Sequence, residues 1–257
     1  MKTQLSSNNP FGMNAKGYLW ERLSKRNPSA LHLDYGAHDG RMLHLMAETG
    51  VIQQGIGVDL NSAVVERSAD KLHENVKLFA ISKNPTLPFP DGHFESTSIV
   101  GVLEHIHNQT HIINELVRVT KPGGEILVAV PGKHLFSFLD MGNWKFTFPR
   151  AHKWFYTLSH TQAEYLLRYA ANKDGLIGDI EAEKSWHEHF SYEELGALLE
   201  RHGLKVVDSD GFGFFNRVLM NLRFFVPGML KRLLDPLIKM DAKAFSATEI
   251  WVVAKKP

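Results

Sequence analysis

Acidic and glycine residues occur together in the turn that connects an expected strand to the helix after it. The segment 31–43 reads LHLDYGAHDGRML, in which Asp34, Gly36 and Gly40 follow a short apolar run, after which an apolar pattern resumes. Glycine lets the backbone approach a ligand closely, and the first turn of a helix offers unpaired N–H groups to a carboxylate or phosphate. This turn is therefore expected to bind a nucleotide-like ligand.

A second acidic residue, Asp59, stands at the end of the next apolar run, GIGVDL. An acid at the end of the second strand of an open α/β sheet can accept hydrogen bonds from both ribose hydroxyls. The glycine turn itself departs from the pattern G-x-G-x-x-G of dinucleotide-binding proteins, because His38 and Arg41 replace two of its glycines. NAD is therefore less expected as the ligand, whereas other ligands that contain a nucleoside remain compatible with the sequence.

The elements that must position these residues alternate along the chain. Expected strands cover 30–35, 55–60, 76–81, 96–103, 124–131, 204–209 and 248–255, and expected helices cover 14–26, 41–49, 61–74, 111–120 and 192–203. This alternation predicts an α/β fold, a doubly wound, Rossmann-like, seven-stranded and mostly parallel sheet with an antiparallel last strand. Residues 1–257 are expected to form a single domain with two insertions.

The first insertion, 132–186, is rich in aromatic residues and has no clear strand or helix period. It includes Trp144, Phe146, Trp154 and Trp186. Insertions at the ends of such a sheet surround the ligand, so this one is expected to be a lid over an apolar or planar substrate. The alternative is that the aromatic rings build a small separate core.

The second insertion, 211–245, is amphipathic and basic and separates the last two strands. Leu230, Leu233, Leu234 and Leu237 follow helical spacing, and Asp235-Pro236 is expected to interrupt that helix. Basic residues beside such an apolar stripe are compatible with peripheral contact with an anionic membrane. A cover for the core, or the contact of a homodimer, is the plainer interpretation.

Composition narrows the class of protein. The 29 Lys and Arg residues nearly balance the 28 Asp and Glu residues, so the protein lacks the net positive charge that would indicate a nucleic-acid partner. The chain has no cysteine, which excludes disulfides and thiolate chemistry and fits a reducing compartment. It shows neither the apolar region of a secretory signal nor a long apolar stretch. A cytoplasmic protein is therefore expected, and peripheral contact with the membrane is the open alternative.

Several ordered segments together resemble the class I S-adenosylmethionine-dependent methyltransferases, and in particular the broad small-molecule group called type 11. They are LDYGAHDG, GVDL, LPFPDGHFES, VLEHI and RVTKPGGEILVAVP, followed later by HFSYEELGALLERHGLKVV. The resemblance covers about residues 30–131 and resumes at about 187–210. It implies S-adenosyl-L-methionine as the cofactor and S-adenosyl-L-homocysteine as its product.

The resemblance also implies roles for single residues. Backbone around Gly36, Ala37 and Gly40 would contact the methionine part of the cofactor, Asp59 would hold the ribose, and Leu60 would pack beside the adenine. Asp34 would either touch the cofactor or brace the turn through backbone N–H groups.

Two residues depart from the family pattern. His38 replaces the middle glycine, so the turn must aim this side chain outward or use it to shape the site. Lys83 occupies the position where the family often has an acid for the adenine amino group. Backbone at Ile81 and Ser82 would serve that purpose instead.

Transfer of an activated methyl group requires alignment of the acceptor and, for a hydroxyl acceptor, removal of a proton. His105 follows the fourth expected strand and is the candidate catalytic residue, because histidine titrates near neutral pH. A structural histidine bonded to a neighbouring loop is the alternative. His134, His152 and His160 are further candidates for the base.

No metal site is expected. Some relatives bind a divalent metal through E-x-x-E-H, but Gly101 stands here in place of the first glutamate. His187 and His189, two residues apart, could suggest a ligand pair, although such histidines more often pack around a helix entrance.

The leading hypothesis is methyl transfer to an oxygen of a small-molecule or lipid-linked acceptor, in preference to a nitrogen or a carbon. Two alternatives remain open, a protein that binds S-adenosylmethionine without turnover and a methyltransferase that acts on RNA or protein.

Overall fold

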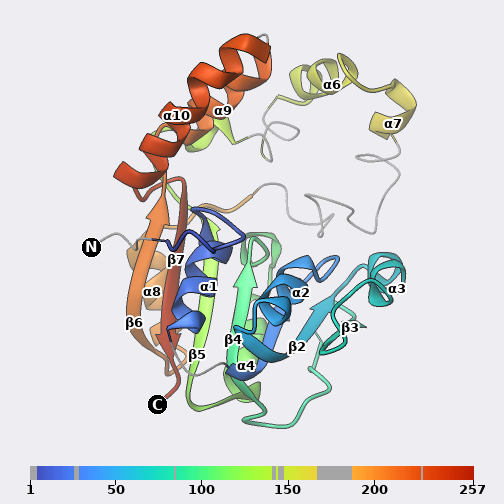
Figure 1. Ribbon diagram of the computed structural model, residues 1–257, viewed down its shortest axis with the longest axis vertical. Coiled ribbons are helices and arrows are strands. Elements are labelled where there is room, and N and C mark those ends of the chain that lie inside the picture. Colours follow the sequence, from blue (N-terminus) through green and yellow to red (C-terminus); the bar gives the residue numbers. More distant parts are fainter. Residues whose placement is uncertain are drawn as a thin grey trace.

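A seven-stranded sheet forms the centre of the computed structural model, which describes residues 5–25, 29–83, 85–140, 143, 148–166, 187–226 and 228–257. The strand order is β3-β2-β1-β4-β5-β7-β6 (Figure 1). The strands are β1 Ser29–Tyr35, β2 Ile52–Asp59, β3 Val76–Ala80, β4 Phe94–Val100, β5 Thr120–Pro131, β6 Lys205–Phe212 and β7 Glu249–Lys255.

The direction of the strands confirms the expected fold class. Strands β1 to β5 pair in parallel, whereas β7 pairs antiparallel with both β5 and β6. The strand order reverses between β1 and β4, because β2 and β3 lie on one side and β4 to β7 on the other. Ligands of open α/β sheets bind at such a switch point, beyond the carboxyl ends of the strands.

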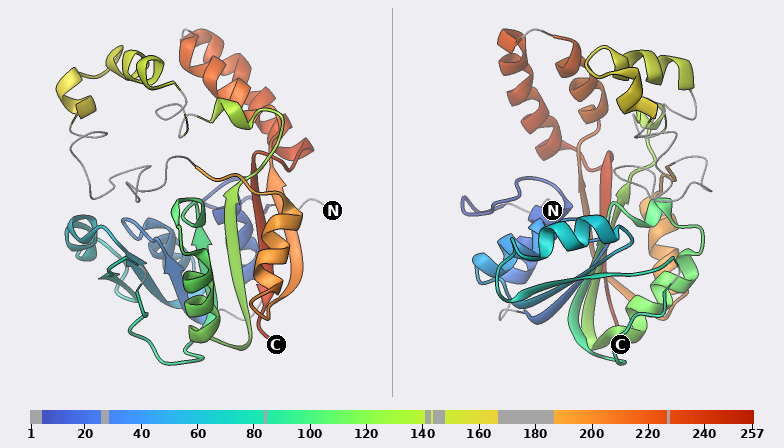
Figure 2. Two further views of the ribbon diagram at one scale, coloured as in Figure 1. Left: turned by 180° about the vertical axis from the view of Figure 1, so that it is seen from behind. Right: turned by 90° about the vertical axis from the view of Figure 1, so that its right-hand side faces the viewer.

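Helices cover both faces of the sheet. Helices α1 Ala15–Ser24 and α2 Arg41–Glu48 pack on one face, and α4 Gln109–Val119 and α8 Tyr192–Glu200 pack on the other (Figure 2). Ser191 and Glu194 form a capping box at the start of α8, which satisfies backbone N–H groups that the helix leaves unpaired. The short helix α3 Ser62–Ala69 follows β2, and the 3-10 turn η1 Leu103–His105 follows β4.

The central strands are buried on both faces, which explains why they appear in the sequence as unbroken apolar runs. In β5, Ile126 and Val128 belong to the core under α4 and α8, whereas Leu127 and Ala129 belong to the core under α1 and α2. Successive residues of a strand point to opposite faces, so a strand covered on both sides needs apolar residues at every position.

A further layer of helices lies beyond the carboxyl ends of the parallel strands (Figure 1). It contains η2 Ser137–Leu139, α6 Pro149–Thr157 and α7 Gln162–Leu166 from the first insertion, and α9 Asn216–Phe225 and α10 Gly228–Ala244 from the second. Helices α9 and α10 pack against each other, and Arg223 of α9 pairs with Asp235 of α10 at 2.8 Å. Trp144, Phe146 and Trp186, named above for the first insertion, lie outside the described residues.

Several element boundaries differ from those expected; for example, β2 starts at Ile52 rather than at residue 55, and β4 ends at Val100 rather than at residue 103. Helix α3 ends at Ala69 rather than at residue 74. Strand β6 continues to Phe212, because its pairing with β7 extends to Phe212 and Glu249, so the second insertion starts later than residue 211. Strand β5 starts at Thr120 rather than at residue 124, and its pairing with β4 has a register irregularity between Phe94 and Ser96.

The expected break at Asp235-Pro236 is wrong. Helix α10 runs from Gly228 to Ala244 with Pro236 inside it. Proline there removes one backbone hydrogen bond of the helix, a cost of about 3 kcal/mol. The remaining turns and the packing against α9 keep the helix continuous.

Candidate functional site

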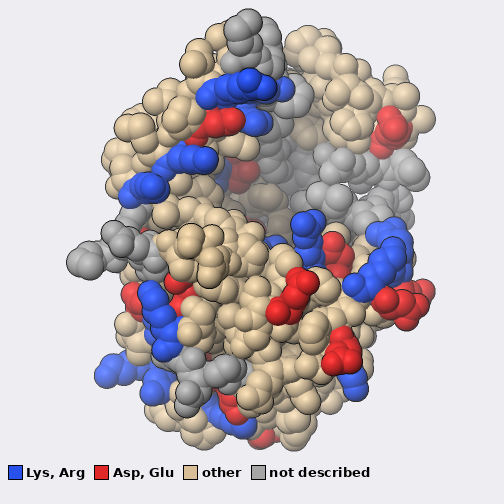
Figure 3. All heavy atoms as spheres, in the orientation of Figure 1, with Lys and Arg blue, Asp and Glu red and all other residues tan. Residues whose placement is uncertain are grey.

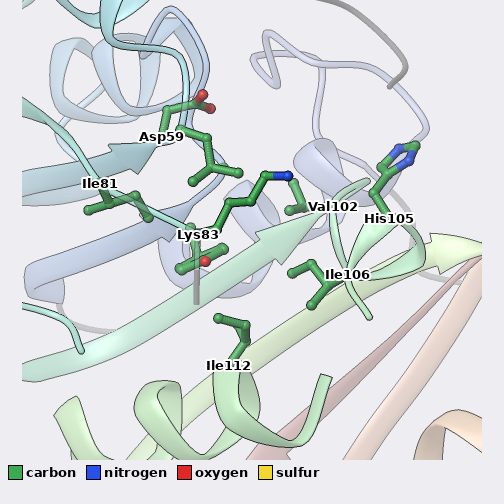
Figure 4. A pocket seen from close by; sticks show the side chains of 10 residues that line it. Asp59, Ile81, Lys83, Val102, His105, Ile106 and Ile112 are labelled. Carbon is green, nitrogen blue, oxygen red and sulfur yellow. The ribbon is translucent and has the colours of Figure 1, made fainter. Parts of the chain in front are cut away.

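A cavity opens at the switch point of the sheet, where β1 and β4 end side by side. It encloses about 440 Å³ of empty space, including its opening to solvent. The cavity is lined by Tyr35, Gly36, Asp59, Leu60, Ile81, Lys83, Val102, His105, Ile106 and Ile112. Asp59 and His105 lie on opposite sides, with Lys83 and Val102 between them (Figure 4).

Gly36 makes the turn at the bottom of this cavity. Its φ is +82°, and a Cβ added there would lie 2.2 Å from Cγ2 of Val102. Both the backbone angle and the contact therefore require glycine at this position. The N–H groups of Gly36 and Ala37 donate to the carbonyl of Val58, so in this structure they hold the turn against β2.

Gly40 and Ala37 lie in the same turn as Gly36 but outside the cavity lining. Gly40, at a φ of +70°, precedes α2, and a Cβ added there would lie 2.9 Å from Cδ1 of Leu72. Ala37 is buried and belongs to the core under α1 and α2. Neither residue lines the cavity, so their contact with the cofactor stays a prediction.

His38 points its side chain outward, one of the two arrangements that the sequence allowed. The residue has a φ of +50°, unusual for a residue other than glycine, and its side chain is half-exposed. Its backbone N–H donates to Oδ2 of Asp59 at 2.7 Å. The substitution of the middle glycine therefore leaves the cavity open and ties the turn to the end of β2.

Asp59 is buried and is held by two backbone groups. Oδ2 accepts from the N–H of His38, and Oδ1 accepts from the N–H of Asn61 at 2.9 Å. A carboxylate oxygen has two lone pairs, so each oxygen can accept a further hydrogen bond. The carboxylate is thus fixed in orientation and can accept from a pair of neighbouring hydroxyl groups.

The rest of the cavity lining is largely apolar. It includes Leu60, Ile81, Val102, Ile106 and Ile112, and Lys83 adds a cation. A fixed acceptor of two hydrogen bonds beside flat apolar walls suits an adenosine group, with its diol and its planar base. The residues present therefore fit S-adenosylmethionine. Ser82 is exposed and does not line the cavity.

Asp34 lies below the cavity and not on its wall. Its carboxylate accepts a hydrogen bond from Oγ of Ser98 on β4 at 2.7 Å, and this Ser98 oxygen is also 3.0 Å from Nε2 of His32. Burial raises the pKa of Asp34 to about 6. The side chain thus braces β1 against β4 through a hydroxyl group. The sequence had left two roles open for it, contact with the cofactor and bracing of the turn through backbone N–H groups.

His105 lies where β4 ends, with its side chain only 11% exposed. Its ring packs edge-on against the ring of His187, with 4.4 Å between the ring centres. Nε2 of His105 is 4.0 Å from Oε1 of Glu104, which is itself buried. The expected catalytic residue therefore lies on the wall of the cavity and in contact with a buried polar cluster.

Asp140 is the centre of that cluster. Its Oδ2 is 2.9 Å from Nε2 of His189, 3.0 Å from Nη1 of Arg217 and 3.5 Å from Nδ1 of His187. Burial alone would raise the pKa of Asp140, but the two histidines and Arg217 together hold it well below its usual range. His187 and His189 therefore meet at one carboxylate. In the described part of the chain, no group of three or more His, Asp or Glu side chains is arranged to hold a metal ion.

The three other candidate bases lie away from the cavity. His134 is packed among aromatic rings, and burial lowers its pKa to about 4. His152 is buried with Nδ1 3.1 Å from the hydroxyl of Tyr165. His160 is exposed and stacks on Tyr156.

Sequence reasoning missed two kinds of residue. Val102, Ile106 and Ile112 follow β4, and the rule that ligands bind beyond strand ends could have identified them. Asp140 carries no such signal, because its partners lie far along the chain in segments without a common motif.

Comparisons with known proteins agree with this geometry. A methyltransferase-domain family model matches residues 18–209. A ubiquinone/menaquinone biosynthesis C-methyltransferase from Laribacter hongkongensis is 35% identical over 72 residues, which are 27% of this chain and 30% of that protein. A demethylmenaquinone methyltransferase from Tropheryma whipplei is 31% identical over 96 residues, 37% of this chain and 39% of that protein. The chain spans about half or less of the length of the curated relatives it matches.

Solved structures share the fold at low identity. A SAM-dependent methyltransferase from Aquifex aeolicus has a TM-score of 0.54 at 14% identity, covering 98% of this chain and 94% of that one. The [4+2]-cyclase SpnF has a TM-score of 0.57 at 18% identity, covering 93% of this chain and 81% of that one. The family match over most of the chain, together with this fold, shows that the chain belongs to the methyltransferase-domain family.

Proposed function

We propose that this protein transfers a methyl group from S-adenosylmethionine to an oxygen or a ring carbon of a lipid-linked acceptor. The observation that carries the proposal is the cavity at the switch point, with Asp59 fixed on one side and His105 on the other. The bound cofactor would supply a methyl group that is already activated for transfer. The chain's own residues bind and orient the two reactants, exclude water and remove a proton where the acceptor requires it.

The acceptor class follows from the relatives and from the surface above the cavity. The relatives named above act in quinone biosynthesis according to their names. In this chain, the first insertion presents large apolar side chains to solvent, among them Leu135, Phe138, Phe148 and Trp154. Exposed apolar side chains in this number suit contact with an apolar chain or a membrane. These observations favour a lipid-linked acceptor over a small polar one.

Helix α10 supports contact with an anionic membrane. Leu230, Leu233, Leu237 and Met240 are exposed along one side of the helix, and Leu233 and Met240 are about two-thirds exposed. Four cations, Lys231, Arg232, Lys239 and Lys243, accompany them on the same helix and form no ion pair within the described residues.

The two acidic residues of helix α10 already have partners. Asp235 pairs with Arg223, and Asp241 accepts the backbone N–H groups of Phe214 and Phe215. Figure 3 shows the resulting row of Lys and Arg side chains over the upper left of the molecule. An apolar stripe with unpaired cations matches the surface of an anionic bilayer. In the described chain, no helix is long and apolar enough to span a membrane.

The decisive test of the proposed activity uses methyl-labelled S-adenosylmethionine with a lipid extract and, separately, with a polar metabolite extract. The expected result is label in the lipid fraction and a mass gain equal to one CH2 group in one lipid species. Label only in the polar fraction would contradict the lipid-linked acceptor. Label that nuclease or protease removes would indicate a macromolecular acceptor.

A second candidate function is binding of S-adenosylmethionine without methyl transfer. His38 and Lys83 both depart from the family pattern, and a fold neighbour of this chain is named as a [4+2]-cyclase. Tight binding of the cofactor without release of S-adenosylhomocysteine in any extract would favour this second function.

A further inference from the structure

The polar cluster beside the cavity contains atoms whose hydrogen-bonding capacity is unused. Among the described residues, five buried side-chain N or O atoms have no hydrogen-bond partner, and two of them, Oε2 of Glu104 and Nε2 of His187, belong to residues that lie beside His105. A buried polar atom without a partner costs about 1–3 kcal/mol. Such a cost concentrated at one place indicates a site that a ligand completes.

Glu104 is the strongest of these groups. The residue is only 3% exposed, and its Oε2 has no partner although the adjacent His105 lines the cavity. Burial raises the pKa of Glu104 to about 7, with Glu249 and Asp140 adding to this rise and His187 opposing it. Near neutral pH the carboxyl group can therefore take up or release a proton.

His187 is held in place by Asp140. Its Nδ1 faces Oδ2 of Asp140 at 3.5 Å, which leaves Nε2 on the other side of the ring as the unpaired nitrogen. The ring packs edge-on against His105. Asp140 therefore acts as a positioning residue, which fixes the ring that stands beside the cavity wall.

We propose that Glu104 and His187 form a subsite for the protic oxygen of a phenol or enol acceptor, next to His105. In this subsite the O–H bond of the acceptor breaks, the proton moves to Oε2 of Glu104, and the electron pair stays on the acceptor oxygen. The resulting anion is a nucleophile at its oxygen or at the conjugated ring carbon. Nε2 of His187 donates to the same oxygen when both ring nitrogens carry a proton, and this hydrogen bond stabilises the anion. The inference rests on the proposed function and names the acceptor chemistry of that same site.

The test uses 4-nitrophenol, whose ionised form absorbs visible light, together with S-adenosylhomocysteine and the full chain. S-adenosylhomocysteine binding is first measured by calorimetry, and the absorbance of the bound phenol is then followed. The wild-type protein is expected to bind the phenol and to increase its ionised fraction. Glu104→Gln is expected to bind S-adenosylhomocysteine as the wild type does but to lose this increase.

The matched control is Glu200→Gln, which removes an exposed carboxylate at the end of α8. It is expected to behave as the wild type. His187→Phe keeps a ring against His105 but removes the unpaired nitrogen, so it provides a second variant if Glu104→Gln does not fold. It is expected to weaken phenol binding about tenfold, the effect of one lost hydrogen bond to a buried polar group, with S-adenosylhomocysteine binding unchanged.

The outcomes separate the two proposals. Equal ionisation of the phenol by the wild type and by Glu104→Gln would overturn the subsite and leave the proposed function intact. The same conclusion would follow if the wild type bound S-adenosylhomocysteine but no phenol. Absence of S-adenosylhomocysteine binding in the wild type would overturn both.

Discussion

At the scale of single residues, burial controls the charge of two carboxyl groups that lie near the cavity but not in its lining. Burial raises the pKa of Asp34 to about 6 and that of Glu104 to about 7. Asp140, which is less buried, has three cationic or hydrogen-bonding partners that lower its pKa instead. The site therefore combines a carboxylate that stays ionised with carboxyl groups that change charge near neutral pH.

Glu104→Gln should change how stability depends on pH. In the folded protein the pKa of Glu104 is about 7, against 4.5 for the free side chain, so the folded state holds the proton more tightly than the unfolded state. The free energy of unfolding therefore falls as pH rises from about 4.5 to about 7, by roughly 3 kcal/mol through this one group. Glu104→Gln has no carboxyl group at this position, so this part of the fall in the free energy of unfolding is absent from the variant.

Urea unfolding of the wild type and of Glu104→Gln at about pH 5 and about pH 8 measures this difference. Asp34 and Glu249, whose pKa values burial also raises, are present in both proteins, so their contributions cancel. The same change in unfolding free energy between the two pH values in both proteins would show that Glu104 titrates normally.

Gly36→Ala should destabilise the fold by at least about 2 kcal/mol, because the added Cβ meets Val102 at 2.2 Å and the backbone keeps a positive φ. Gly50→Ala is the matched control, since Gly50 has a φ of +70° with no heavy atom within 4 Å of the added Cβ. It carries the backbone cost alone, about 1 kcal/mol. Equal thermal shifts for both variants would contradict the close packing of the turn.

The sequence predicted the site residues that follow strand ends. Gly36, Asp59, Leu60, Ile81 and His105 line the cavity as a consequence of their positions after β1, β2, β3 and β4. Asp34, Ala37, Gly40 and Ser82 were also expected at the site but do not line the cavity. A sequence motif specifies which residues are adjacent in the chain, but it does not specify the direction in which each side chain points. The contacts of Asp140 depend on how three distant segments pack, and no local pattern encodes that packing.

At the scale of elements, apolar patterning accounts for the strands and for most helices. Strands β5 and β7 are buried on both faces, so apolar residues occupy successive positions and the strands are easy to recognise. Ends of elements are decided by pairing and packing, and this explains the extension of β6 and the continuity of α10 through Pro236. Local propensity alone points to a break at Pro236.

Helix α10 provides a test of membrane contact. The double variant Leu233→Glu with Met240→Glu should reduce binding to anionic vesicles at least tenfold, because it removes two exposed apolar side chains and adds negative charge beside the cations. Cosedimentation with phosphatidylserine-containing vesicles measures this, and wild-type binding should weaken as salt increases.

Val207→Glu is the control for α10, because Val207 is 42% exposed on β6, away from the helix. It should bind vesicles as the wild type does. Equal vesicle binding by wild type and the double variant would contradict membrane contact through α10. A change in the sedimentation coefficient of the double variant without vesicles would assign the stripe to a homodimer.

At the scale of the whole molecule, the sheet and the layer of helices beyond its strand ends contribute different parts of the site. The sheet core, buried on both faces, fixes the switch point at which Asp59 and His105 face the same cavity. The insertions contribute the exposed apolar and basic surface and, through Asp140 and Arg217, part of the polar cluster. The proposed function therefore assigns cofactor binding to the sheet and selection of the acceptor to the insertions.

The central claim is that the cavity binds S-adenosylmethionine with Asp59 on the ribose, and calorimetric titration of S-adenosylhomocysteine tests it most directly. The wild type should bind at one site per chain. Asp59→Ala should weaken binding by about 1–3 kcal/mol, or roughly 5- to 150-fold, through loss of hydrogen bonds to a charged acceptor. No binding by the wild type, or equal affinity for wild type and Asp59→Ala, would contradict the account.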